Sequence, residues 1–152
     1  MSADRPARLR AAVAECERHV RYLEAARGRL PERIDSPMLD RPDDALVASL
    51  DQFAYRFARL QDTLGQRLLR LFLVGVLREP FEDAPMRDVL DRLERLGYLV
   101  AERWEQYRAV RNALVHDYPE EAEQRAARLM LAFEMAAELK RLLDRLQQEV
   151  GD

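Results

Sequence analysis

Apolar residues recur three or four positions apart along most of the chain, a spacing that is typical of amphipathic helices. The stripe Leu46, Leu50, Phe53, Phe57, Leu60 and Leu64 keeps this spacing over five steps. No segment shows the alternation of apolar and polar residues that indicates a strand. The pattern therefore predicts an all-α protein of four to five helices.

Prolines, glycines and capping residues predict where the first two helices begin and end. A helix is expected from Pro6 to about Arg29, and the segment from Pro31 to Pro42 is expected to be a linker. Asp43 can cap a second, long helix that continues to about Leu77, because an aspartate side chain accepts the free backbone N–H groups of a first turn.

Three further helices follow the loop between Pro80 and Pro85. The third runs from Met86 to about Leu96, the fourth carries Trp104 and ends near His116, and the last runs from Pro119 to the C-terminal end. Short connections between long helices favour an antiparallel up-and-down bundle, expected to be a single domain over residues 1–152.

Charge and cysteine content limit the classes of function. The 25 basic and 28 acidic residues give a net charge of −3, so any RNA site has to be a local basic patch rather than the whole surface. The single cysteine, Cys16, excludes an internal disulfide framework and a multi-cysteine metal site, and it is expected to pack in the core. With no signal peptide and no membrane-spanning run, the expected location is the cytoplasm, away from membranes. His19 lies among charged neighbours and is expected to be exposed to solvent.

An arginine interrupts the apolar stripe of the fourth helix. Arg111 takes a position that the spacing from Trp104 assigns to the apolar face. A half-buried guanidinium needs an anion, which can be the phosphate of a ligand or a carboxylate such as Asp62 or Asp117. A structural ion pair is the simpler interpretation of Arg111 taken alone.

His116 follows Arg111 by five residues, which separates the two side chains by about 140° on a continuous helix. Pro119 disfavours helical backbone just before it, so the helix is expected to end near His116 and to let the imidazole turn towards Arg111. Asn112 and Tyr118 would join them at one cleft. The simpler alternatives are that His116 caps the helix and that Tyr118 seals the loop.

The segment Arg-Asn-Ala-Leu-Val-His-Asp-Tyr at residues 111–118 matches the pattern Arg-x4-His-x-Tyr, with an asparagine directly after the arginine. It resembles the HEPN superfamily, and within it the HepT-like toxins of HEPN/minimal nucleotidyltransferase toxin–antitoxin systems. The resemblance implies a small helical bundle that forms a homodimer with two facing clefts.

The resemblance also implies a toxin-like, metal-independent endoribonuclease that needs no cofactor. His116 would act as general base or general acid, Arg111 would stabilise the charge that develops on phosphorus, and Asn112 would orient His116 or the phosphate. Asp62, Arg56 and Arg59 are expected to line the same cleft as supporting residues. The substrate would be RNA, with transfer RNA as one candidate.

Regulation is implied at Tyr118, which matches the tyrosine that a cognate minimal nucleotidyltransferase antitoxin adenylylates in HepT-like toxins. The added phosphate and base would compete with RNA at Arg111. Two alternatives remain open on the sequence. The chain could be a non-catalytic nucleotide- or substrate-binding subunit of a nucleotidyltransferase, or a purely structural helical oligomerisation domain.

Overall fold

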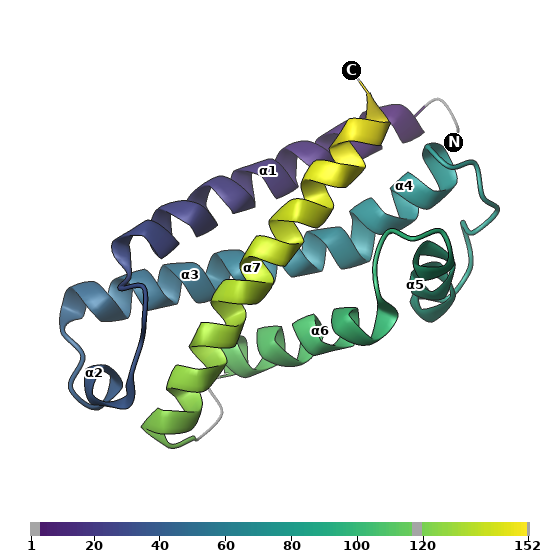
Figure 1. Ribbon diagram of the computed structural model, residues 1–152. Coiled ribbons are helices and arrows are strands. Elements are labelled where there is room, and N and C mark those ends of the chain that lie inside the picture. The colour runs from purple at the N-terminus through teal and green to yellow at the C-terminus, as the bar shows by residue number, and fades with distance from the viewer. Residues whose placement is uncertain (1–3, 117–119, 152) are drawn as a thin grey trace.

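The computed structural model describes residues 4–116 and 120–151, and in these ranges all regular secondary structure is helical. The prediction of an all-α bundle is confirmed. The elements (Figure 1) are α1 (Arg5–Arg29), α2 (Ser36–Asp40), α3 (Asp44–Thr63), the π-helical segment η1 (Leu64–Leu68), α4 (Leu69–Gly75), α5 (Met86–Arg95), α6 (Ala101–His116) and α7 (Ala122–Val150).

The predicted long helix is present as α3, η1 and α4, which follow one another without a break. The Asp43 carboxylate accepts a hydrogen bond from the backbone N–H of Leu46 at 2.7 Å, so the predicted cap is confirmed. The helix ends at Gly75, two residues before the expected end at Leu77. The π-helical segment was not predicted, because an apolar stripe alone does not reveal one extra residue in a turn.

The expected linker between α1 and α3 contains the short helix α2, so describing it only as a linker was wrong. Asp35 caps this helix by accepting a hydrogen bond from the backbone N–H of Met38 at 3.1 Å, and Pro37 lies in its first turn. An aspartate followed by a proline is a helix-start signal that could have been recognised.

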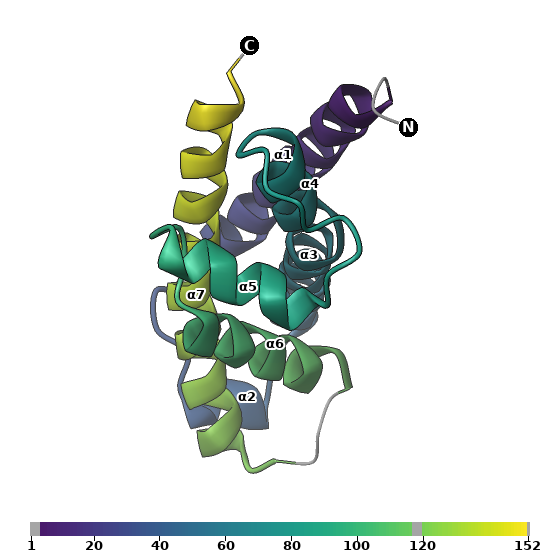
Figure 2. The same ribbon diagram turned by 90° about the vertical axis from the view of Figure 1, so that its right-hand side faces the viewer.

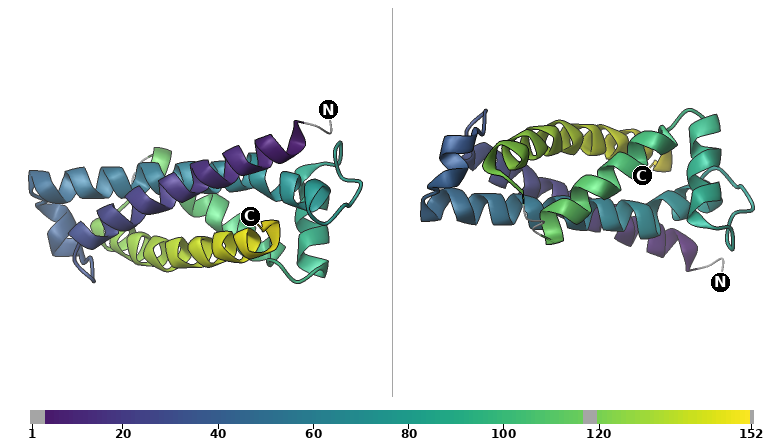
Figure 3. Two further views of the ribbon diagram at one scale, coloured as in Figure 1. Left: turned by 90° about the horizontal axis from the view of Figure 1, so that it is seen from above. Right: turned by 90° about the horizontal axis from the view of Figure 1, so that it is seen from below.

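Helices α1 and α3 lie side by side and run in opposite directions, and α7 crosses both on one side (Figures 1 and 3). Their contacting faces form one core cluster with α6. The largest fully buried side chains include Phe53 and Phe57 of α3, Trp104 of α6 and Met135 of α7. Burying each such side chain stabilises the fold by about 1.5–3 kcal/mol.

Helix α5 lies across the end of α4 and close to α6 (Figure 2). Arg70 of α4 donates a hydrogen bond to the backbone oxygen of Phe81 at 2.6 Å, and Arg92 of α5 pairs with Glu79 at 2.7 Å. These bonds hold the loop between α4 and α5 against both helices. Gly97 ends α5 as predicted, with a φ of 85° that favours glycine.

The two residues that were singled out on the first helix are both buried. Cys16 is fully buried, which confirms its predicted packing role, and burial raises the pKa of its thiol to about 12. His19 is only 2% exposed, so the prediction of a solvent-exposed histidine is wrong. It lies three residues after Cys16, on the stripe that faces α3, and this position outweighs the charges of its chain neighbours.

Within residues 4–116 and 120–151, none of the helices combines the length and the apolar character needed to cross a membrane.

Candidate functional site

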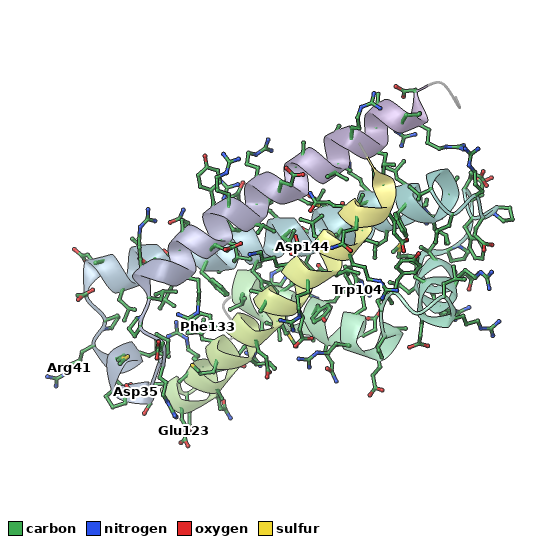
Figure 4. The ribbon with its side chains drawn as sticks, turned by 45° about the horizontal axis from the view of Figure 1, so that its top comes forward. Asp35, Arg41, Trp104, Glu123, Phe133 and Asp144 are labelled. Atoms are coloured by element: carbon green, nitrogen blue, oxygen red, sulfur yellow. The ribbon has the colours of Figure 1, made fainter. Side chains whose placement is uncertain are left out.

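A cleft of about 420 Å³ lies where α3 and η1, α5 and α6 meet. Trp104 of α6 is 1% exposed and lines the cleft, and Figure 4 labels it beside α6. Asp62, Arg108 and Arg111 contribute polar and charged groups from α3 and α6, and Arg87 adds a guanidinium from α5. The cleft therefore combines an aromatic wall with several charged groups.

Gly65 of η1 allows Trp104 to approach the long helix closely. A Cβ atom at position 65 would lie 3.0 Å from Cζ2 of Trp104, closer than ordinary van der Waals contact. The π-helical segment lies at this same point of the helix, and such segments are frequent at functional sites. The glycine and the π-helical turn together shape one side of the cleft.

Arg111 forms a two-point pair with Asp62, the partner that the sequence suggested. Its Nε donates to Oδ1 of Asp62 at 3.1 Å, and its Nη2 donates to Oδ2 at 2.8 Å. Its Nη1 donates to the side-chain oxygen of Asn112 at 3.2 Å. The expected ion pair of Arg111 with Asp62 is present.

The pair does not use the full hydrogen-bonding capacity of Arg111. A guanidinium has five N–H groups, and the three bonds just described occupy three of them within the described part of the chain. The side chain is 25% exposed and lines the cleft. Arg111 can therefore bind an anion from the cleft while Asp62 holds its orientation.

The other charged side chains of the cleft favour an anionic ligand. Arg87 and Arg108 add two positive charges beside Arg111, against the carboxylates of Asp62 and Glu105. Arg108 is 57% exposed and pairs with Glu105 at 3.0 Å on the surface of α6. An exposed pair of this kind contributes little to stability, so Arg108 can rearrange towards a phosphate at small cost.

His116 is the last residue of α6 and is exposed. Because α6 is helical from Arg111 through His116, the two side chains leave the helix about 140° apart. The imidazole would have to reach across this angle to meet Arg111 within one chain, so that expectation stays a prediction. The predicted end of the helix near His116 agrees with the structure.

Tyr118 lies outside the described residues, as do Asp117 and Pro119. Its predicted role as a modification site therefore remains a prediction. The chain on either side is described: α6 ends at His116, and α7 begins at Ala122.

Arg56 and Arg59 were expected at this cleft and lie elsewhere. Arg56 places Nη1 3.0 Å from Nδ1 of His19, and Arg59 donates to Glu15 at 3.2 Å. Both partners belong to α1, so these arginines face α1. The expectation was wrong because each residue turns a helix by about 100°, and the side on which α1 packs decides what those positions contact.

Among the residues that line the cleft and that sequence reasoning missed, three matter most for its chemistry. Arg108 precedes Arg111 by three residues and so shares its helix face, a signal that was available. Trp104 was assigned to the apolar stripe without a link to the site. Arg87 could not be found from the chain, because only the tertiary placement of α5 brings it to α6.

In the described ranges no group of three or more histidine, cysteine, aspartate or glutamate side chains is arranged to hold a metal ion. Comparison of the chain with models of protein families, with curated proteins and with solved structures gives no match. A function must therefore be argued from the cleft and from the Arg-x4-His-x-Tyr segment.

Proposed function

We propose that this chain is a metal-independent endoribonuclease of the HEPN type, which acts as a homodimer and is inhibited by adenylylation of Tyr118. The observation that supports it most is the fork of Arg111, held by Asp62 at the edge of a cleft with two further arginines. Planar guanidinium groups fixed in this way suit the two-point binding of phosphate.

In the proposed reaction, the ribose 2′-oxygen attacks the adjacent phosphorus while a base takes the proton of the 2′-hydroxyl. The bond from phosphorus to the 5′-oxygen breaks, and an acid protonates the leaving oxygen. His116 supplies the imidazole for one or both transfers, and Arg111 stabilises the negative charge on the phosphoryl oxygens. Asn112 holds one edge of that guanidinium.

A homodimer would solve the problem that Arg111 and His116 diverge on one helix. A second protomer can bring its own His116 to the first protomer's Arg111, and two histidines can act as acid and base in the same reaction. Exposed apolar side chains support such an interface: Val47 of α3 is 41% exposed and Val115 of α6 is 46% exposed. Both line one hollow of about 400 Å³ beside the end of α6.

Adenylylation of Tyr118 by a partner nucleotidyltransferase would regulate this site through charge and bulk. The tyrosine follows His116 by two residues. An attached AMP would bring a phosphate that competes for the arginines and a base that occupies space at the end of α6. Co-expression with such a transferase should therefore add the mass of one AMP to the chain and abolish its RNA cleavage.

RNA cleavage in excess EDTA tests the proposal. Wild-type protein that is free of adenylylation should cleave single-stranded RNA, and His116→Ala should lower the rate by about 100- to 10,000-fold. Circular dichroism and urea unfolding of both proteins check that the variant is folded. Equal cleavage by the two folded proteins would contradict the proposal.

The alternative is a nucleotide-binding subunit that does not cleave RNA. The cleft volume of about 420 Å³ favours it, because pockets for small ligands commonly measure about 300–1,000 Å³. Under this alternative neither protein cleaves RNA, whereas titration with ATP shows binding that Arg111→Gln abolishes.

A further inference from the structure

A second basic surface follows the junction of α1 and α3, beside the Arg111 cleft and separate from it. The two helices lie side by side (Figure 1). We call it the arginine–tyrosine strip, and its members are exposed or half-buried along this junction and its continuation beside α4: Arg5, Arg8, Tyr22, Tyr55, Arg56, Arg59, Arg67 and Arg70.

One end of the strip is aromatic. Tyr22 of α1 is 38% exposed and Tyr55 of α3 is 56% exposed. The guanidinium carbon of Arg56 lies 4.5 Å from the ring centre of Tyr22 and 5.2 Å from that of Tyr55. Arg56 thus lies beside both rings, which leaves two tyrosines on the surface next to a positive charge.

A buried histidine holds Arg56 in this position. Arg56 can only donate, so Nδ1 of His19 at 3.0 Å must be an acceptor and the imidazole proton must lie on Nε2. Nε2 points to Glu15 at 3.5 Å. Burial lowers the pKa of His19, and the charges of Arg56 and Arg59 lower it further against the opposing effect of Glu15, which keeps the imidazole neutral.

Two arginines on one carboxylate form the middle of the strip. Glu15 accepts hydrogen bonds from Arg59 of α3 and Arg67 of η1. Burial alone would raise the pKa of Glu15, but Arg67 and His19 lower it below its usual value, so the carboxylate stays charged. The side chain of Glu15 is 15% exposed, whereas those of Arg59 and Arg67 are 45% and 46% exposed. Glu15 therefore anchors two guanidinium groups that still face solvent.

The other end of the strip is a small hollow of about 160 Å³ with four arginines on its walls. Arg67 belongs to both this hollow and the middle of the strip, and Arg5, Arg8 and Arg70 complete the set. Glu82 is the carboxylate among the residues that line it. Along its length the strip thus has six arginines against the two glutamates, in a chain whose net charge is −3.

We propose that the arginine–tyrosine strip binds single-stranded RNA, with phosphates on the arginines and bases stacked on Tyr22 and Tyr55. This inference rests on the proposed ribonuclease function, for which it supplies a path for the substrate. Exposed aromatic rings beside a row of cations are the combination that single-stranded nucleic acids recognise.

The dimensions fit a short strand that reaches the cleft. From Tyr55 to Arg70 the long helix rises about 22 Å at 1.5 Å per residue. At about 3.4 Å per stacked nucleotide, this length accommodates about six nucleotides. Arg59 precedes Asp62 by one helical turn, and Asp62 holds Arg111, so RNA on the strip lies next to the proposed cleavage site.

The chemistry of the strip favours RNA over an acidic protein or a membrane. An acidic peptide would pair with the arginines and leave the faces of both tyrosines unused. A lipid surface requires exposed aliphatic side chains, whereas the large exposed apolar groups of the strip are the rings of Tyr22 and Tyr55. A single-stranded RNA can stack its bases on the two tyrosine rings and pair its phosphates with the arginines at the same time.

Fluorescence anisotropy with a short, labelled single-stranded RNA tests the role of the arginines in the strip. The RNA carries 2′-O-methyl groups, so it lacks the 2′-hydroxyl that cleavage needs. The variant Glu15→Gln/Arg59→Gln/Arg67→Gln removes both arginines together with their shared carboxylate, so no buried charge is left unpaired. It should weaken binding at least tenfold, and it should reduce the slope of log affinity against log salt by about 1.4, or about 0.7 per lost phosphate contact.

The matched control Glu32→Gln/Arg33→Gln/Arg41→Gln makes the same change in charge at exposed residues near α2, where Figure 4 labels Arg41. It should bind RNA like the wild type. An equal loss of RNA affinity in both triple variants would contradict the proposed RNA site on the strip, because net charge alone would then explain binding.

The aromatic part is tested without disturbing Glu15. Tyr22→Leu/Tyr55→Leu should weaken RNA binding about fivefold or more per ring, whereas Tyr22→Phe/Tyr55→Phe keeps both rings and should bind like the wild type. Unchanged binding in the leucine variant would overturn the stacking role. Binding to vesicles of anionic phospholipid with the same variant pattern, and none to RNA, would also overturn the proposal.

The strip and the ribonuclease proposal can fail separately. If the wild type binds RNA through the strip and does not cleave it, the proposal that the strip binds RNA is supported and the ribonuclease proposal is wrong. If the wild type cleaves RNA and the strip variants bind and cleave it equally well, the RNA-binding proposal for the strip is wrong and the ribonuclease proposal is supported.

Discussion

Two arginines on α6 make nearly the same pair with a carboxylate, yet they lie in different surroundings. Arg103 donates from Nε and Nη2 to the two oxygens of Glu138 on α7, at 2.8 and 2.7 Å. Arg111, eight residues later, donates through the same two nitrogens to Asp62 on α3, at 3.1 and 2.8 Å. The first pair joins α6 to α7, and the second joins α6 to α3.

The partners of the two pairs differ. Glu138 also accepts the hydroxyl of Tyr107 at 2.7 Å, and Nη1 of Arg103 bonds to Gln106 at 2.7 Å. The hydrogen bond from Arg103 lowers the pKa of Glu138, and burial raises the pKa of Tyr107. This is a shared network that stabilises a helix junction. Arg111 instead bonds to Asp62 and Asn112 and precedes His116 by five residues.

The comparison shows that a half-buried arginine with an ideal carboxylate partner does not by itself indicate a functional site. Arg103 meets that description as well as Arg111 does. Arg103 also borders two hollows, of about 310 and 410 Å³, and shares the first with Arg141 and Arg145, so a hollow with neighbouring cations does not separate the two residues. The distinguishing feature of Arg111 is the Arg-x4-His-x-Tyr segment that it begins. If this segment matters, exchanging each arginine for lysine must separate stability from activity.

The largest expected effect is on RNA cleavage. Arg111→Lys removes the two-point fork and should lower the cleavage rate by about 100-fold or more, as loss of one charge-stabilising group does. Arg103→Lys should leave the rate of the folded protein unchanged. Both variants should lower the free energy of unfolding by about 1–3 kcal/mol, measured by urea denaturation. Equal losses of cleavage in the two variants would remove the distinction between the two pairs.

The next effect concerns the shape of the cleft. Gly65→Ala places a methyl group 3.0 Å from Cζ2 of Trp104, so it should lower the free energy of unfolding by about 1–3 kcal/mol. Gly75→Ala is the matched control, because its added methyl would meet only the flexible side chain of Arg5, at 3.4 Å. The control should be neutral or raise stability by up to about 1 kcal/mol in thermal unfolding. A Gly65→Ala variant as stable as the wild type would show that the close contact does not constrain the cleft.

Much of this architecture was predictable, because helix periodicity and caps are local signals. The bounds of α1 and α5 and the cap at Asp43 follow from residues within a turn of each end. The Arg111–Asp62 pair was predictable because a guanidinium on an apolar stripe needs an anion from the neighbouring helix.

Other features depend on how the helices pack, which the chain pattern does not specify. His19 is buried because its helix face meets α3, and Arg56 faces α1 for the same reason. The position of Arg87 in the cleft depends on the placement of α5 across the end of α4. A helix periodicity shows which residues share a face but does not show which neighbour that face contacts.

Acid should weaken the α6–α7 junction through Glu138. Its pKa is lowered in the folded protein, so the unfolded chain binds more protons as the pH falls below the ordinary value of 4.5. The stabilising contribution is therefore present above that pH and is lost as the pH falls through the lowered value. Urea denaturation should show a smaller acid-induced loss for Glu138→Gln, which should already be about 1–2 kcal/mol less stable at neutral pH. Glu134→Gln is the control, because Glu134 is 69% exposed at 3.9 Å from Arg103 and should behave like the wild type.

The smallest expected effect tests whether the two pairs act independently. Tyr107→Phe removes one hydrogen bond to Glu138 and should cost about 1 kcal/mol in the free energy of unfolding. Tyr98→Phe, which removes a similar bond to the exposed Glu149, should cost less in the same measurement. Neither change should alter RNA cleavage, because neither hydroxyl reaches the residues that hold Arg111. A loss of RNA cleavage in Tyr107→Phe at unchanged stability would mean that the network around Arg103 positions α6 for the reaction. The contrast between a structural and a functional arginine would then no longer hold.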